Sequence, residues 1–511
     1  MPFARVACRA QVGLSAPLVQ VEVSLASGLP SFSIVGLPAM VVREAKERVR
    51  AALLNSAFEF PAGRITVNLA PADLPKEGGR FDLPIALGLL LASRQVRCAA
   101  AGERAAPPRE FYGELGLTGE LKAVRGLLPA AAQARSAGHE LIVPRANAAE
   151  ACAVAPELVR AADHLLEVCA HVAGTRALAA GAAADPGALR PAARRPTLDL
   201  ADVRGQLHAK RALTIAAGGG HSLLLVGPPG CGKSMLARRL PGLLPPLLPA
   251  EALEVAAIAS VSVAGFRGES LAERPFRAPH HSSSVAALVG GGSRARPGEI
   301  TLAHRGVLFL DELPEFARPV LEALREPLET GVVAVARCAL TTQYPAEFQL
   351  VAAMNPCPCG GLGDSARECR CTPAMVQRYR SRVSGPLLDR IDLQVEMPRV
   401  GPGEFDKVPE ASAGSAAAAA AVGRARELQH ARQGASNARL TDAEVHRCCA
   451  PDAGGRRVLE TALQRLHLSA RGLQRVLKVS RTIADLEGRP TIGAAAVSEA
   501  VMLRCRDRAA G

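Results

Sequence analysis

The chain has 511 residues, of which 49% are hydrophobic and only 3% aromatic, so we expect a core of aliphatic side chains. No apolar run approaches the roughly 18 residues of a membrane-spanning helix and the first residues lack a signal peptide's layout, which predicts a cytoplasmic protein without a membrane partner. The formal charge of +13 favours a polyanion partner such as DNA, although a general drift toward arginine would give the same excess.

The N-terminal block alternates short apolar runs with a helix expected over 40–56, where Val42, Val49 and Leu53 share one face. This is an α/β pattern. Two low-complexity stretches divide the chain into three blocks. The predicted organisation is an N-terminal domain at 1–174, a linker at 175–197, a core at 198–400, a low-complexity segment at 401–422 and a helical block at 423–511.

The core carries apolar, strand-like runs at 223–226, 307–310 and 349–353, with helical segments between them. Such alternation predicts a doubly wound parallel sheet. Beyond residue 420 the apolar residues recur at helical spacing, as at Val476, Val479 and Ile483, which predicts a small helical bundle.

A phosphate-binding loop follows the first of these strand-like runs. It consists of Gly227, Pro228, Pro229, Gly230, Cys231, Gly232, Lys233 and Ser234. The glycines let backbone amides surround phosphate oxygens, the lysine supplies a cation for the β- and γ-phosphates, and the serine hydroxyl is a ligand for Mg²⁺. The sequence therefore predicts ATP and Mg²⁺ as cofactors.

Two later strand ends supply the groups that hydrolysis needs. Asp311 and Glu312 follow a buried run; the first is expected to hold Mg²⁺ with Ser234, and the second to orient the attacking water. Asn355 ends another apolar run and is expected to sense the γ-phosphate. A solvated acidic turn, and an asparagine that merely precedes a proline, are the alternative interpretations.

Arginines near the end of the core and in the helical block are candidates for contacting phosphate. Arg390 lies in a short charged elbow, while Arg471, Arg475 and Lys478 lie near one face of a helix. An arginine inserted at a neighbour's phosphates stabilises transition-state charge, and one from a helical lid couples lid angle to nucleotide state. Pairing of Arg390 with an aspartate of its own elbow, and solvent exposure of Arg475 or Lys478, remain the alternatives.

Four cysteines within fifteen residues form two C-x-C pairs, at Cys357, Cys359, Cys369 and Cys371. In a reducing compartment they suggest a tetrahedral zinc site just after the sensor strand. The C-x-C spacing is less usual than C-x₂-C, so buried thiols remain the alternative.

The order of these motifs resembles that of AAA+ ATPases, and more narrowly that of the magnesium-chelatase-like ComM/YifB family. The resemblance covers nearly the whole chain. It is carried by the phosphate loop, the acidic strand end and the segments Asp202–Gln206, Arg277–Ser282, Gly290–Gly292, Asn355–Gly360, Ser384–Asp392 and Arg481–Leu486. It implies that Asn355 is the first sensor, Arg390 a finger acting on a neighbouring subunit and Arg471 the second sensor. A finger of that kind implies a ring, most simply a hexamer.

Two segments of the core have the composition of loops that reach into a central channel. One is the glycine-rich stretch with Arg294 and Arg296, and the other is a hairpin expected over 332–344 with Arg337 near its turn. By resemblance to related helicase rings these are DNA-binding loops, so the three arginines are expected to contact phosphates. Solvated surface arginines are the alternative.

The segment Val67–Ile85 resembles the Lon-protease-like domain of the same family. Proteolysis would need a serine nucleophile activated by a lysine. The residues Gly79–Asp82 stand where that serine would be expected, so we predict a noncatalytic domain in which Lys76 is a structural or DNA-facing charge.

The family resemblance implies an ATP-dependent hexameric motor that drives DNA branch migration during natural transformation. Its implied partners are single-stranded, forked or branched DNA and recombination proteins. A chelatase-type motor that remodels a protein partner is the alternative, weakened by the missing D-x-S-x-S metal-adhesion motif. A Lon-like protease is the second alternative, weakened by the missing serine.

Overall fold

The computed structural model contains two compact units. It describes residues 2–99, 107–181, 198–268, 271–292, 295–337, 340–364, 366–401, 414–466 and 468–504. The first unit comprises Met1–Ala192 and Leu248–Ala272, and the second comprises Ala193–Leu247 and Glu273–Gly511. Each unit has its own apolar core.

The first unit is built on a seven-stranded mixed sheet with the order β3-β4-β2-β1-β5-β8-β9. Alternating buried and exposed residues in the first strands leave one face apolar, as in a half-covered sheet. The strands are β1 (Phe3–Arg9), β2 (Leu18–Ala26), β3 (Ser31–Val35), β4 (Arg64–Ala70), β5 (Arg109–Phe111), β8 (Glu140–Pro144) and β9 (Val159–Ala162), with a small hairpin of β6 (Glu114–Leu115) and β7 (Leu121–Lys122).

The helices of this unit are α1 (Met40–Asn55), α2 (Asp82–Ala92), α3 (Leu127–Ala137), α4 (Ala148–Cys152), α5 (Leu165–Val172) and α9 (Pro249–Val261). The predicted helix over 40–56 is confirmed, and its buried face includes Val42, Val49 and Leu53. Helix α9 lies within the sequence predicted as the core, yet it packs on α3 through Ala256 and Leu128. The apolar face of a helix predicts that this face is buried, but it does not predict which element covers it.

The second unit contains a five-stranded parallel sheet with the order β11-β14-β17-β10-β18, so the predicted fold class is confirmed. The strands at 223–226, 307–310 and 349–354 are apolar apart from Gln349 and buried at every position, as expected for a parallel sheet covered on both faces. The strands are β10 (Leu223–Val226), β11 (Phe276–Arg277), β14 (Val307–Leu310), β17 (Gln349–Met354) and β18 (Leu393–Glu396).

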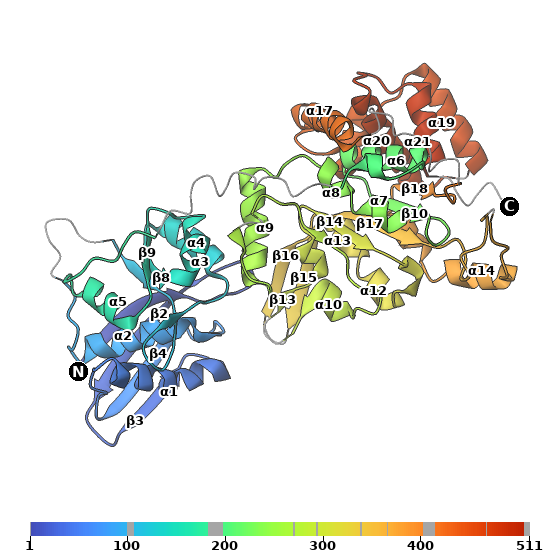
Figure 1. Cartoon of the computed structure of the whole chain (residues 1–511). Helices are drawn as coiled ribbons and strands as arrows, with labels where there is room; N and C mark the ends of the chain where they lie inside the picture. The colour runs from blue at the N-terminus through green and yellow to red at the C-terminus, as the bar shows by residue number, and fades with distance from the viewer. Residues whose placement is uncertain are drawn as a thin grey trace. The chain divides into compact units, whose positions relative to one another are not determined.

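Helices of the second unit pack around this sheet and form a helical lid at one end of the unit (Figure 1). Those near the sheet are α6 (Leu207–Gly219), α7 (Lys233–Ala237), α8 (Leu240–Leu243), α10 (Val285–Val289), α11 (Glu299–Leu302), α12 (Arg318–Glu322), α13 (Arg325–Thr330), α14 (Pro373–Arg380) and α15 (Gly385–Leu388). The lid consists of α17 (Ser415–Gln433), α18 (Asp442–Cys448), α19 (Ala453–Leu466), α20 (Ala470–Leu486) and α21 (Ala494–Met502).

The lid shares one apolar core with the sheet, since Val476 and Ile483 of α20 belong to the same cluster as Leu223 and Leu225 of β10. Helix α17 begins at Ser415, inside the predicted low-complexity segment. Its alanine run explains the difference, because alanine has the highest helix propensity. Residues 182–197 of the predicted linker and 402–413 of that segment lie outside the described residues.

Candidate nucleotide site

The phosphate loop joins β10 to α7 at the carboxyl end of the parallel sheet. Gly230 and Gly232 have φ angles of +81° and +96°, a region that favours glycine. A side chain at Gly227 would collide with the carbonyl oxygen of Met397. The three glycines thus allow the tight turn in which successive amides can surround a phosphate.

Lys233 connects the phosphate loop to the neighbouring strand. Its Nζ atom donates to the carbonyl oxygens of Gly227 at 2.7 Å and Pro228 at 2.9 Å, and to Oδ1 of Asn355 at 3.1 Å. Asn355 follows β17, which pairs directly with β10. Burial lowers the pKa of Lys233, and the nearby acids oppose this shift. The predicted phosphate-binding lysine and the predicted sensor therefore lie in contact.

The predicted Mg²⁺ ligands also meet. Ser234 donates from Oγ to Oδ2 of Asp311 at 2.6 Å, which joins α7 to the end of β14. Hydroxyl and carboxylate oxygens are the ligands that Mg²⁺ uses beside nucleotide phosphates. The donor set therefore fits a magnesium ion between the loop and the acidic strand.

Glu312 is turned out of the strand direction by a φ angle of 54°. One of its carboxylate oxygens lies 3.1 Å from Nδ1 of His281, in the segment after β11. The sequence motif Arg277–Ser282 contains this histidine, but the spacing of the motif does not predict which residue the histidine contacts. The structure thus adds His281 to the residues around the predicted water-orienting carboxylate.

Arg390 and Arg471 converge on one carboxylate, that of Glu329 in α13. Arg390 lies 2.7 Å from Glu329 Oε1 and its side chain is only 7% exposed, whereas Arg471 lies 3.8 Å away and is 65% exposed. The Nε atom of Arg390 is buried without a hydrogen-bond partner among the described residues. Arg390 therefore forms its ion pair within its own chain, with Glu329 of α13 and not with an aspartate of its elbow, and it also donates from Nη1 to the Pro386 carbonyl oxygen at 2.8 Å.

Arg475 is held by a buried polar network between the lid and the sheet. It donates to Asp392 and, at 3.0 Å, to the carbonyl oxygen of Arg390. The same carboxylate accepts from the Ser222 amide and lies 3.3 Å from His221, whose other ring nitrogen is 2.7 Å from Thr482 of α20. Burial alone would raise the pKa of Asp392, but the Arg475 guanidinium and the hydrogen bond with His221 hold it well below its usual range.

These contacts separate the roles of the two lid arginines. Arg475 is engaged in the buried network, whereas Arg471 is exposed and makes only a long ion pair. Arg471 is therefore the better candidate for a second sensor. Lys478 also faces the protein, since it donates to the Ala438 carbonyl oxygen at 3.2 Å.

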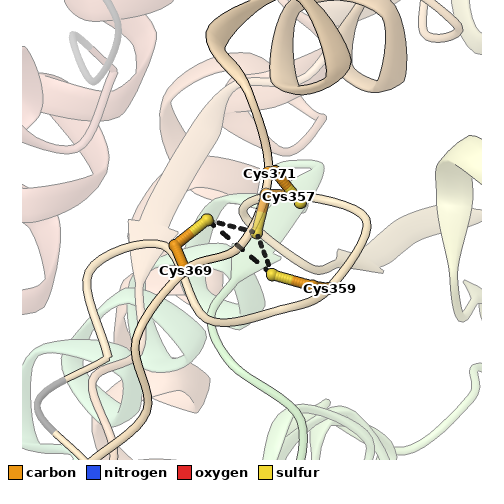
Figure 2. Close-up of side chains that lie close together, drawn as sticks. All are labelled: Cys357, Cys359, Cys369 and Cys371. Atoms are coloured by element: carbon orange, nitrogen blue, oxygen red, sulfur yellow. Dashed lines mark hydrogen bonds between the residues drawn. The ribbon is translucent and has the colours of Figure 1, made fainter.

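The four cysteines gather in the loop after the sensor strand (Figure 2). The Sγ atoms of Cys357, Cys359 and Cys369 lie 3.5 to 3.7 Å apart, and all four sulfurs lie within 4.8 Å of one another. A tetrahedral zinc ion with Zn–S bonds of 2.3 Å separates its sulfurs by about 3.8 Å. The cluster therefore has the donor atoms and the spacing of a tetrathiolate zinc site.

The two predicted DNA-binding segments are adjacent hairpins (Figure 1). One pairs β12 (Gly290–Gly291) with β13 (Arg296–Pro297), and the other pairs β15 (Val332–Arg337) with β16 (Leu340–Pro345). Tyr344 donates to the Ala295 carbonyl oxygen at 2.8 Å and thereby ties the hairpins together. Arg296 is partly exposed, whereas Arg294 and the side chain of Arg337 lie outside the described residues.

In the first unit, Lys76 is fully buried and donates to the Pro71 carbonyl oxygen. Asp82 pairs with Arg48 at 2.7 Å, and burial raises the pKa of this carboxyl to about 6. Its complete burial and its bond to Pro71 make Lys76 a structural residue. None of the helices among the described residues is both long and apolar enough to cross a membrane.

Three family models match the chain. They are described as "Magnesium chelatase, subunit ChlI" at residues 199–405, "Subunit ChlI of Mg-chelatase" at 21–147 and "Magnesium chelatase, subunit ChlI C-terminal" at 412–504. Together they match the nucleotide-binding sheet, part of the N-terminal unit and the lid.

Similar proteins include the "Competence protein ComM" of Haemophilus influenzae, 47% identical over 99% of this chain and 98% of that protein. The "Uncharacterized protein YifB" of Salmonella typhimurium is 49% identical over the same shares. The "Magnesium-chelatase 38 kDa subunit" of Rhodobacter capsulatus is 29% identical over 32% of this chain and 51% of its own length. The chain belongs to the ComM/YifB family of magnesium-chelatase-like AAA+ ATPases.

Proposed function

We propose that this protein is a hexameric ATPase that drives branch migration on DNA in the cytoplasm and thereby aids integration of single-stranded DNA during natural transformation. The observation that carries the proposal is the convergence of Lys233 with Asn355, and of Ser234 with Asp311, at one edge of a parallel sheet. The name of the Haemophilus relative, a competence protein, supports the biological setting.

In this proposal each residue of the site has a separate role in ATP hydrolysis. Lys233 and the loop amides bind the β- and γ-phosphates, and Glu312 orients a water for attack on the γ-phosphorus. Asn355, already in contact with Lys233, reports the loss of the γ-phosphate to the sheet. Mg²⁺, held by Ser234 and Asp311, supplies charge neutralisation at the phosphates.

Arg390 would complete the site of a neighbouring subunit, and Arg471 of the lid would act as the second sensor. Both side chains reach the Glu329 carboxylate, and the guanidinium N–H groups that bind a carboxylate can bind a phosphate in the same geometry. A site shared between successive identical subunits forms a closed ring when the rotation that relates them closes. The hexamer is the ring that the family resemblance implies.

DNA would be contacted by the two joined hairpins. Arg296 lies in β13, and Arg294 and Arg337 belong to the same two segments of the sequence. The excess of basic residues, which gives a charge of +13, supports a nucleic acid partner. Recombination proteins are further partners that this function would require on the same DNA.

The proposal also includes a structural Zn²⁺ bound by Cys357, Cys359, Cys369 and Cys371, because their spacing matches that of a tetrathiolate site. Elemental analysis of the purified full chain is expected to give about one zinc per chain. A preparation without zinc that also fails to take it up would contradict this part.

A junction assay tests the main proposal. The intact protein with ATP and Mg²⁺ is expected to move three-strand or four-way DNA junctions, whereas Glu312→Gln and Lys233→Ala are expected to bind DNA without moving them. Branched DNA should also stimulate ATP hydrolysis. A chelatase-type motor, favoured by the partial similarity to the Rhodobacter subunit, would hydrolyse ATP without that stimulation.

A further inference from the structure

The cysteine loop, defined as residues 357–371, begins two residues after the predicted sensor Asn355. Cys357 is fully buried, its carbonyl oxygen accepts from the Gly360 amide at 3.0 Å, and its sulfur accepts from the Leu362 amide at 3.4 Å. The described part of the loop contains no helix or strand. Its shape therefore depends on the cysteine cluster and on the ion pair of Asp364 with Arg399 at 2.8 Å, and not on regular secondary structure.

The tip of this loop packs against the phosphate loop. Gly360 has a φ angle of +77°, and a Cβ atom added there would lie only 2.6 Å from Cδ and 3.2 Å from Cγ of Pro229. Real Cβ contacts are not that short, so the glycine backbone fills the space beside the proline ring. Pro229 is the third residue of the phosphate loop.

The cysteine loop thus holds the nucleotide site at two points. Its tip contacts the phosphate loop at Pro229, and its start is continuous with Asn355, which contacts Lys233 at 3.1 Å. A displacement of about 1 Å in such positioning contacts can change binding or rate by up to about a hundredfold. Neighbouring thiols without a cation make only weak hydrogen bonds and would not fix these two points.

From these contacts we infer that zinc bound by the four cysteines positions the phosphate loop, so that ATP affinity depends on the metal. The zinc clip acts through Gly360 on Pro229 and through the chain itself on Asn355. The inference rests on the proposed ATP and zinc sites. It adds that the two sites are energetically coupled.

The coupling is tested on the full chain with a fluorescent ATP analogue and Mg²⁺. Cys357→Ser combined with Cys369→Ser is expected to lose zinc and to raise the Kd for the analogue about tenfold or more. Cys98→Ser, an exposed cysteine of the first unit, is the control and should change neither value. Unchanged affinity in the zinc-free variant would overturn the inference.

A second pair of variants keeps the test decisive if loss of zinc unfolds the protein. Gly360→Ala should retain zinc yet weaken nucleotide binding, because the added methyl group pushes the loop off Pro229. Gly363→Ala is the matched control, since its φ angle is +75° but nothing lies within 4 Å of the added atom. Equal affinities for these two variants would refute the coupling.

Different experimental outcomes would contradict the proposed ATP site, the proposed zinc site and the coupling between them. A natural chain that holds zinc but binds no nucleotide would contradict the proposed ATPase function. The metal site is tested by zinc content and by adding Co²⁺, which absorbs visible light when it is bound tetrahedrally. A chain that binds nucleotide but contains no zinc and shows no such absorption would contradict the metal site and, with it, the inference.

Discussion

His281 Nδ1 lies 3.1 Å from a carboxylate oxygen of Glu312, the residue expected to orient the attacking water. The histidine follows β11 and precedes α10, which leads directly into the β12–β13 hairpin. A carboxylate that is bonded to an imidazole presents one oxygen fewer to water. The contact therefore restrains Glu312 from a segment that continues into a predicted DNA-binding hairpin.

His281→Ala is expected to raise ATP hydrolysis without DNA by up to about fivefold, because a partly exposed contact of this kind contributes at most about 1 kcal/mol. Steady-state phosphate release measures this. His280→Ala is the control: it removes a neighbouring ring that bonds Ser282 instead of Glu312. A decrease in hydrolysis in the His281 variant would show that the histidine supports the catalytic carboxylate instead of restraining it.

Arg390→Ala is expected to retain nucleotide binding and to lose about a thousandfold in hydrolysis rate, the usual effect of removing an arginine finger. Mixing it with Glu312→Gln tests action on a neighbour. In mixed rings, an Arg390→Ala subunit beside a Glu312→Gln subunit has an intact site with a supplied arginine, so activity should partly return. Two inactive variants that stay inactive when mixed would argue for action within one chain.

The stability of the second unit is expected to fall on acidification below about pH 6.5. Burial lowers the pKa of His221, and Arg426 and Lys478 reinforce this shift while Asp392 opposes it. Below the ordinary histidine pKa of about 6.5 the unfolded chain therefore binds a proton that the folded chain excludes. The free energy of unfolding must then decrease as the pH falls.

Thermal unfolding at pH 7.5 and 5.5 checks this expectation. His221→Gln is expected to be less stable at pH 7.5, because contacts to Asp392 and Thr482 change, but to lose less on acidification than the natural chain. An identical loss in both proteins would assign the acid sensitivity to other groups.

Arg296→Ala is expected to weaken DNA binding for all sequences and to reduce the slope of log affinity against log salt by about one. Arg457→Ala, an exposed arginine of α19, serves as the control and should leave the slope unchanged. Equal slopes for Arg296→Ala and the natural chain would remove this residue from the proposed DNA contacts.

The sheet and the phosphate loop could be predicted because each depends on local sequence. Continuous apolar runs predict β10, β14 and β17. Lys233, Asp311 and Asn355 follow the carboxyl ends of these three strands. Once the strands are parallel neighbours, these side chains must meet. Contacts between distant, weakly patterned segments could not be predicted in this way.

Glu329 illustrates that limit, since it lies 61 positions before Arg390 in a short helix with no motif. His281 and Gly360 are further examples: their partners, Glu312 and Pro229, lie on other elements, and only the three-dimensional arrangement pairs them. The alanine run at the start of α17 shows a different limit, because low complexity at 401–422 predicts a boundary outside the helical block although alanine favours a helix.

Helix α9 determines how the protein can be divided. Its Ser260 bonds to Glu150 at 2.5 Å, and its apolar face covers Leu128 and Val154, so it is a component of the first unit inserted into the sequence of the second. A truncated polypeptide starting at residue 198 would keep this helix but lose Leu128 and Val154, which the helix covers. The apolar face of the helix would then be exposed to solvent and prone to association. An isolated ATPase fragment that remains dispersed in solution should therefore also omit residues 248–272 and close the gap with a short polar linker.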